Sequence, residues 1–178
     1  GEVERGSALM EDEISREREL GDARGLGGAL YNYGASLADS EEPGRAATIL
    51  EEARAVLKGA GNAYGVTITT HALGSAALTL GANEQALALS AEALPGFAEH
   101  GDTDGVAYCL LNIAVALARL SKNTDAALLL AAGERSLAGL GIVIPPDGQK
   151  HVAAANSLLQ QAFGPELEPL LAKGRQLS

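Results

Sequence analysis

The sequence predicts an all-α fold, a superhelix of helical hairpins about forty residues long. Three observations predict it. The pairs Gly21-Asp22, Gly61-Asn62 and Gly101-Asp102 recur at a spacing of forty residues. Between these pairs, apolar residues follow the three- and four-residue spacing of amphipathic helices. Aromatic residues make up only 3% of the chain, so Ala and Leu must build the core, which suits closely packed helices. A fixed period of this length indicates repeats that bury their apolar faces against each other.

The chain begins with one helix over residues 1–20 that aligns with the second helix of a repeat and has no first helix before it. We therefore expect a fragment that starts inside a repeat. Val3, Met10 and Ile14 form its apolar stripe and should lie against the first hairpin. An uncapped solenoid end leaves an apolar face uncovered, and a homodimer through this open end would cover it. Fraying is the competing expectation, because Glu13 and Glu17 interrupt the stripe.

Three repeats follow, at residues 21–60, 61–100 and 101–140. First helices are expected at 23–40, 63–80 and 103–120, and second helices at 43–59, 83–99 and 123–139. The glycine before each first helix suits a left-handed turn, and the Asp or Asn after it suits an N-cap. Pro95 falls within the second helix of the middle repeat and should kink or shorten it.

Other columns of the repeat predict how the helices pack. The columns Gly34, Gly74, Ala114 and Ala46, Ala86, Ala126 hold only small residues. Small side chains let two helix axes approach closely, so each hairpin should cross at these positions. The expected core comprises Leu26, Leu30, Leu37, Leu50, Leu57, Val66, Leu73, Leu89, Val106, Ile113, Leu117, Leu129 and Leu137.

The period ends after Gly141. The segment 142–146, Ile-Val-Ile-Pro-Pro, interrupts the pattern. Two more helices are expected near 148–162 and 166–176, as a C-terminal helical cap over residues 141–178. The whole chain, residues 1–178, is then one repeat domain.

Composition and motifs exclude several functions. The chain has 13 basic and 23 acidic residues, a formal net charge of -10, and no basic stripe, which disfavours direct binding of nucleic acid. It has no long apolar stretch and no signal peptide, so we expect a cytoplasmic protein that does not bind membranes. There is no phosphate loop, no nucleophile elbow and no metal-ligand spacing among His71, His100 and His151. We therefore expect no cofactor, no metal, no catalytic residues and no enzyme activity.

The residues resemble a known family. Leu73-Gly74, Ala77, Ala86 and Ala93 resemble the skeleton of tetratricopeptide repeats, although that unit is about 34 residues long and usually has a Trp where Leu30, Thr70 and Leu110 stand. The segments 19–25 and 29–34, and the ending from Pro145-Pro146 to Ser178, are similar to the repeat region of large bacterial, actinobacterial-type, ATP-dependent transcriptional regulators of the LuxR or maltose-activator kind.

The resemblance implies a tetratricopeptide-like, non-catalytic module that binds a protein, a peptide or a small-molecule effector in signal sensing and transcription regulation. Nucleotide and DNA binding would belong to neighbouring domains of the full-length chain. Two alternatives stay open: a structural oligomerisation scaffold, and the repeat region of a signalling enzyme such as an adenylate cyclase or a kinase.

The binding site is expected on the concave face, which the first helices line in tetratricopeptide folds. Positions that face inward in that family predict the candidates Tyr31, Asp39, His71, Ser75, Thr79, Tyr108, Leu111 and Arg119, together with Gly28, Ala35, Ile68 and Val115. Tyr31, His71 and Tyr108 form a central strip suited to an apolar peptide or a sugar. The alternative is that some of these side chains only pack between neighbouring repeats.

Overall fold

A computed structural model describes residues 2–38 and 42–177, and every regular element in them is helical. The helix α1 (Glu2–Leu20) comes first. Three hairpins follow: α2 (Ala23–Ala38) with α3 (Pro43–Gly59), α4 (Ala63–Thr79) with α5 (Asn83–Glu99), and α6 (Thr103–Arg119) with α7 (Asn123–Gly139). The chain ends with α8 (Pro146–Phe163), a 3₁₀ turn (Gly164–Glu166) and α9 (Leu167–Gly174). The all-α superhelix is confirmed.

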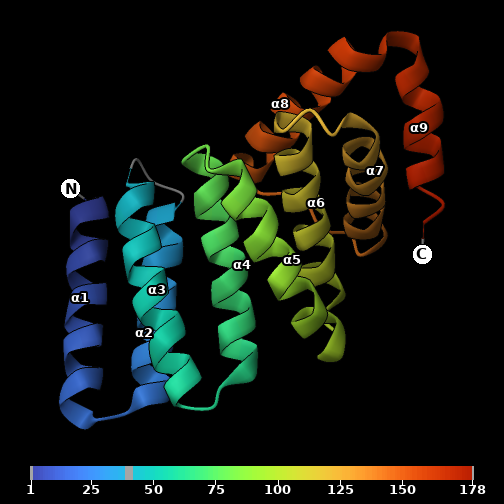
Figure 1. The fold of residues 1–178 in the computed structure, drawn as a ribbon. Helices are drawn as coiled ribbons and strands as arrows, with labels where there is room; N and C mark the ends of the chain where they lie inside the picture. The colour runs from blue at the N-terminus through green and yellow to red at the C-terminus, as the bar shows by residue number, and fades with distance from the viewer. Residues whose placement is uncertain (1, 39–41, 178) are drawn as a thin grey trace.

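The hairpins stack in chain order, with α1 at one end and α8 and α9 at the other (Figure 1). Each second helix packs on the first helix of the next repeat, α3 on α4 and α5 on α6. Neighbouring first helices also contact each other, α2 with α4 and α4 with α6. The two last helices leave this order: α8 packs on α6, and α9 packs on α7. Within the ranges 2–38 and 42–177, no helix is both long enough and apolar enough to cross a membrane.

The turns between repeats have the expected chemistry. Gly21, Gly61, Gly101 and Gly141 are all left-handed, with φ between 67° and 70°. The side chains of Asn62 and Asp102 then accept hydrogen bonds from the backbone N–H three residues later, at 2.9 Å in both repeats. These caps satisfy amide groups that have no partner within the helix. The glycine turns and the caps are therefore confirmed.

The two helices of each hairpin cross where the small residues stand. Ala46, Ala86 and Ala126 are 0% exposed. A Cβ added to Gly34 would lie 2.7 Å from Leu50 Cγ, and one added to Gly74 would lie 2.7 Å from Ser90 Oγ. Both distances are far below van der Waals contact, so a larger residue at either position would force the neighbouring side chain to move.

The core differs from the expected one at four positions. Nine of the thirteen expected core residues are buried, whereas Leu26, Val66, Val106 and Leu129 are half-buried. Val66 and Val106 occupy the same repeat position, and each lines an open cleft between two neighbouring repeats. Their partial exposure thus follows from the way neighbouring repeats meet.

Pro95 does not shorten its helix. The helix α5 runs from Asn83 to Glu99, which gives it the same 17 residues as α3 and α7. Pro95 and Ala91, whose carbonyl loses its partner, are both exposed. Water can therefore hydrogen-bond that carbonyl, and the expectation of a shorter helix is wrong.

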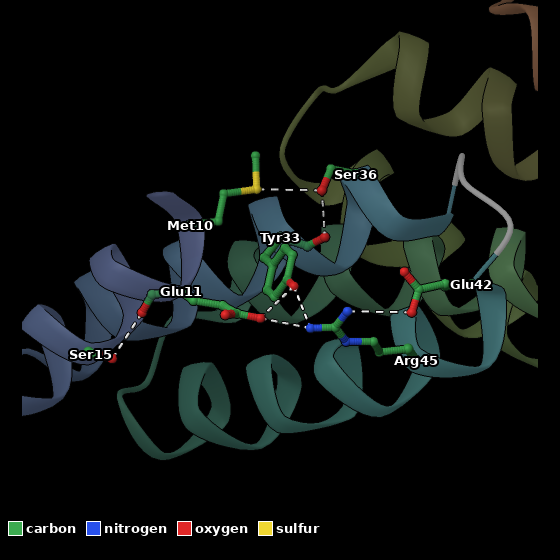
Figure 2. A network of polar contacts seen from close by, with 7 residues as sticks. All are labelled: Met10, Glu11, Ser15, Tyr33, Ser36, Glu42 and Arg45. Atoms are coloured by element: carbon green, nitrogen blue, oxygen red, sulfur yellow. Dashed lines mark hydrogen bonds and ion pairs between the residues drawn. The ribbon is translucent and has the colours of Figure 1, made fainter. Parts of the chain in front are cut away.

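The first helix docks through a small apolar contact and a polar network. Ile14 is 5% exposed, and Met10 packs on the same cluster; the side chain of Val3 lies outside the described residues. Figure 2 shows the network: the Tyr33 hydroxyl donates to Glu11 Oε1 at 2.9 Å, and Arg45 Nη2 donates to the Tyr33 hydroxyl at 2.6 Å and to Glu11 at 2.8 Å. The network joins α1, α2 and α3.

Candidate functional site

A groove of about 380 Å³ lies on the face made by the first helices of the three repeats. Its volume is within the range of small-molecule sites, about 300–1,000 Å³. One further wall comes from α8 and the segment before it. The groove is lined by Tyr31, Ala35 and Ala38 of α2, by His71, Ala72, Ser75 and Thr79 of α4, by Tyr108, Leu111, Asn112 and Val115 of α6, and by Ile144, Pro145, Gly148, His151 and Val152.

The structure brings most of the sequence-predicted site residues together in this groove. The candidates that line it are Tyr31, His71, Ser75, Thr79, Tyr108 and Leu111. Arg119 does not line the groove. It contacts His151, which does line it. Asp39 lies outside the described residues.

The two polar lining residues that the sequence did not predict are Asn112 and His151. Asn112 follows Tyr108 by four residues and therefore shares its helix face. A lone amide on that apolar helix was a usable signal. For His151 no local signal existed, because its place in the groove depends on how α8 packs against α6.

Asn112 orients the imidazole of His71. Its Nδ2 atom lies 2.9 Å from Ser75 Oγ and 3.3 Å from His71 Nε2. The Ser75 hydroxyl donates to the carbonyl of His71 at 3.4 Å, so its oxygen must accept the hydrogen bond from Asn112. An amide nitrogen only donates, and Nε2 is therefore an acceptor. The proton of the neutral imidazole is then on Nδ1.

His71 is uncharged at neutral pH. Burial lowers the pKa of His71 to about 4, against a weaker opposing effect of Asp102. Its ring lies 6.2 Å from the ring of Tyr108 and 5.8 Å, edge-on, from the ring of Phe97. Burial also raises the pKa of Tyr31 and of Tyr108, so both phenols keep their protons. The central strip thus offers three neutral rings.

A second polar group ties α8 to the repeats. Arg119 donates from Nη2 to His151 Nδ1 at 2.7 Å and from Nη1 to the carbonyl of Leu78 at 2.6 Å. His151 Nε2 lies 3.3 Å from Thr79 Oγ1. Because Arg119 can only donate, His151 Nδ1 accepts. These contacts hold the α8 wall against α4 and α6.

Other hollows in the described chain have a different character. Clefts of about 710 Å³ beside Val66 and about 600 Å³ beside Val106 lie at equivalent positions in two repeats. A hollow that recurs in this way follows from the stacking itself. A further one, about 790 Å³, lies between α8 and α9 and is bordered by residues from this C-terminal part of the chain alone. The groove differs because it combines several repeats with α8.

Potential reactive groups do not gather in the groove. Among residues 2–38 and 42–177, no cluster of three or more His, Cys, Asp or Glu side chains is placed to hold a metal ion. Cys109 is buried beside Phe97 and Ala93, and burial raises the pKa of its thiol to about 12. This thiol is therefore protonated at neutral pH.

No family model matches the chain, and a search of curated proteins finds no match either. The geometry and chemistry of the groove are therefore the evidence for function.

Proposed function

We propose that this chain is a non-catalytic binding module whose concave groove receives an effector. The observation that carries the proposal is the convergence of α2, α4, α6 and α8 on one cavity of about 380 Å³ with aromatic, apolar and a few polar walls. Small-molecule sites have this composition. Apart from Ile144 and Pro145, the lining side chains stand on helices, which position them more rigidly than loops do.

The groove also supports a role in signalling. Its walls come from three separate repeats, so a molecule bound across it contacts elements that otherwise touch only their neighbours. Binding would favour one curvature of the superhelix over others and pass that preference to adjoining domains. We therefore propose the sensor region of a bacterial, cytoplasmic transcriptional regulator. The repeat region of a cyclase or a kinase would use the groove in the same way.

The test is thermal unfolding with a panel of metabolites and short peptides. A ligand that binds only the folded state raises the Tm of the native chain. The variant Ala35→Trp fills the groove and should abolish the rise. Its matched control is Ala88→Trp, on the exposed side of α5, which should retain it. An effector that stabilises Ala35→Trp as well as the native chain would place binding elsewhere.

One observation favours the alternative of an oligomerisation scaffold. Leu9 and Leu20 of α1 are 63% and 70% exposed, and apolar side chains in such positions often mark contacts between chains. If α1 mediates a dimer, sedimentation should show association that depends on concentration and that disappears in Leu9→Lys. A native chain that remains monomeric at high concentration excludes this role.

A further inference from the structure

The walls of the groove narrow the chemical class of the effector. We infer that the groove selects an uncharged small molecule with a planar ring and a hydrogen-bond acceptor. The ring lies against Tyr31 and Tyr108, and the acceptor faces His71 Nδ1. This inference rests on the proposed function, because it describes what the same groove binds.

The charge of the ligand follows from the lining. None of the described lining residues is Asp, Glu, Lys or Arg. A charged ligand would lose its hydration without gaining a counter-charge, which is costly. The guanidinium of Arg119 does not line the groove, and it donates hydrogen bonds to the Leu78 carbonyl and to His151. A neutral molecule avoids this cost.

The size of the ligand is limited by the wall that closes one side of the groove. Ile144, Pro145 and Val152 form a wall that belongs to α8 and its preceding segment, and α8 packs on α6. The remaining volume of about 380 Å³ is near the lower end of small-molecule sites. A globular partner would need a surface of roughly 800 Å² on each side. The groove therefore suits a small molecule better than a protein.

The hydrogen bond follows from the tautomer of His71. Asn112 occupies Nε2, which leaves the N–H at Nδ1 as the donor. In the described part of the chain, the buried side-chain polar atoms without a partner are Asn83 Oδ1 and Ser90 Oγ, and neither residue lines the groove. Within the described residues, His71 Nδ1 has no hydrogen-bond partner, and His71 lines the groove. A hydrogen-bond acceptor on the ligand would give the N–H at His71 Nδ1 a partner.

The planar ring follows from the neighbours of that donor. The rings of His71 and Tyr108 are 6.2 Å apart and tilted by 49°, and Tyr31 lines the groove from α2. Aromatic rings attract other rings in offset or edge-on arrangements. A flat ring can contact these side chains while an attached carbonyl reaches His71.

The first experiment measures charge selectivity with one ring. The full 178-residue chain is titrated with indole-3-acetamide, indole-3-acetate and tryptamine, which are neutral, anionic and cationic, and groove resonances are followed by NMR. We expect the amide to bind at least about tenfold more tightly than either ion, since an unpaired charge in the groove costs more than about 1.4 kcal/mol.

The outcomes separate the inference from the proposed function. Tighter binding of an ion in the groove overturns the inference and leaves the binding module intact. The absence of any groove shift with all three probes also overturns the inference. The proposed function itself fails only if the effector panel also gives no stabilisation that Ala35→Trp abolishes.

A second experiment tests His71. The native chain should prefer indole-3-acetamide over 3-methylindole, which lacks the acceptor, by about three- to tenfold, the ratio that one hydrogen bond supplies. His71→Phe keeps a planar ring but removes the donor, so the preference should vanish while 3-methylindole binds as before. Asn112→Leu removes the hydrogen bond to Nε2 that keeps the proton on Nδ1, so it should reduce the preference. An unchanged preference in both variants overturns the role of His71.

Discussion

At the scale of single residues, Ser121 has a backbone conformation that its own chemistry disfavours, and His71 has a strongly lowered pKa. Ser121 is the one non-glycine residue with positive φ, 60°, in the described chain. Left-handed backbone costs an L-residue roughly 1–2 kcal/mol. The α6–α7 turn imposes this conformation on Ser121. In that turn the N–H of Ser121 donates a hydrogen bond to the carbonyl of Ala118 at 3.1 Å. Burial lowers the pKa of His71 to about 4, so its ring stays neutral at a lower pH than an exposed imidazole does.

Ser121→Gly should stabilise the protein. Glycine removes the strain at φ 60° but loses more backbone entropy on folding, about 0.5–1 kcal/mol. The net gain in the free energy of unfolding should be about 0.5–1 kcal/mol. Urea denaturation measures it. Gly81, at the same place one repeat earlier with φ 74°, provides the reverse test, since Gly81→Ser should destabilise. Equal midpoints for all three proteins would contradict the strain at this turn.

Protonation of His71 should make stability depend on pH. The folded pKa is about 4, below the ordinary value of about 6.5, so the unfolded chain binds the proton first. Stability should therefore fall as pH drops from about 6.5 towards 4, by roughly 3 kcal/mol at most. Comparing unfolding at about pH 7 and pH 5 for the native chain and His71→Gln measures this contribution. If the free energy of unfolding of His71→Gln fell as steeply with pH, the pH dependence would belong to other groups.

At the scale of elements, the helices are held with unequal strength. The helix α6 has ten buried residues, from Gly105 to Ala118, because α4, α5, α7 and α8 all pack on it. In α1, Ile14 is the one described side chain that is fully buried. The polar network of Figure 2 therefore contributes more to the docking of α1 than exposed polar contacts usually contribute to stability. The ring of Tyr33 is buried, which holds its hydroxyl in place.

Tyr33→Phe should loosen α1 selectively. The hydroxyl donates to Glu11 and accepts from Arg45, and two such bonds lost from a partly buried network cost about 1–2 kcal/mol. Hydrogen exchange within α1 should accelerate about five- to thirtyfold. Tyr64→Phe is the control, because its hydroxyl bonds Asp102 at 2.7 Å in another repeat. Equal acceleration of α1 in both variants would remove the network as the cause.

At the scale of the whole molecule, the two ends of the superhelix differ. One end is the lone helix α1, whereas at the other Val152, Ala155 and Leu159 of α8 join the largest core cluster. In a solenoid each repeat contacts only its neighbours, so protection spreads from the centre and declines towards a weakly packed end. The return of α8 onto α6 should prevent that decline at the C-terminal side.

Native-state hydrogen exchange should therefore show an asymmetric gradient. Amides of α6 and α7 should be the slowest, those of α1 the fastest, and those of α8 closer to α6 than to α1. Leu159→Ala, at a position 0% exposed, should cost about 2–5 kcal/mol and make α8 exchange faster. Protection in α1 that matches α6 would mean that the chain unfolds as one unit.

Local chemistry lets the sequence alone determine the repeat and its elements. A left-handed turn at Gly61, a cap at Asn62 and a crossing at Gly74 each depend on residues within one hairpin, and the structure has all three. The resemblance to tetratricopeptide repeats indicated which face of each first helix points inward, so Tyr31, His71 and Tyr108 were predictable groove residues.

Only the tertiary structure decided which chemistry that face has. The return of α8 to α6 is a contact between distant segments, and it makes an open concave face into a bounded groove. The same packing places His151 beside Arg119 and Thr79, which directs the guanidinium away from the cavity. The lowered pKa of His71 likewise depends on burial, and its tautomer depends on Asn112, 41 residues later. Desolvation and long-range hydrogen bonds are properties of the assembled helices, and no local sequence pattern encodes them.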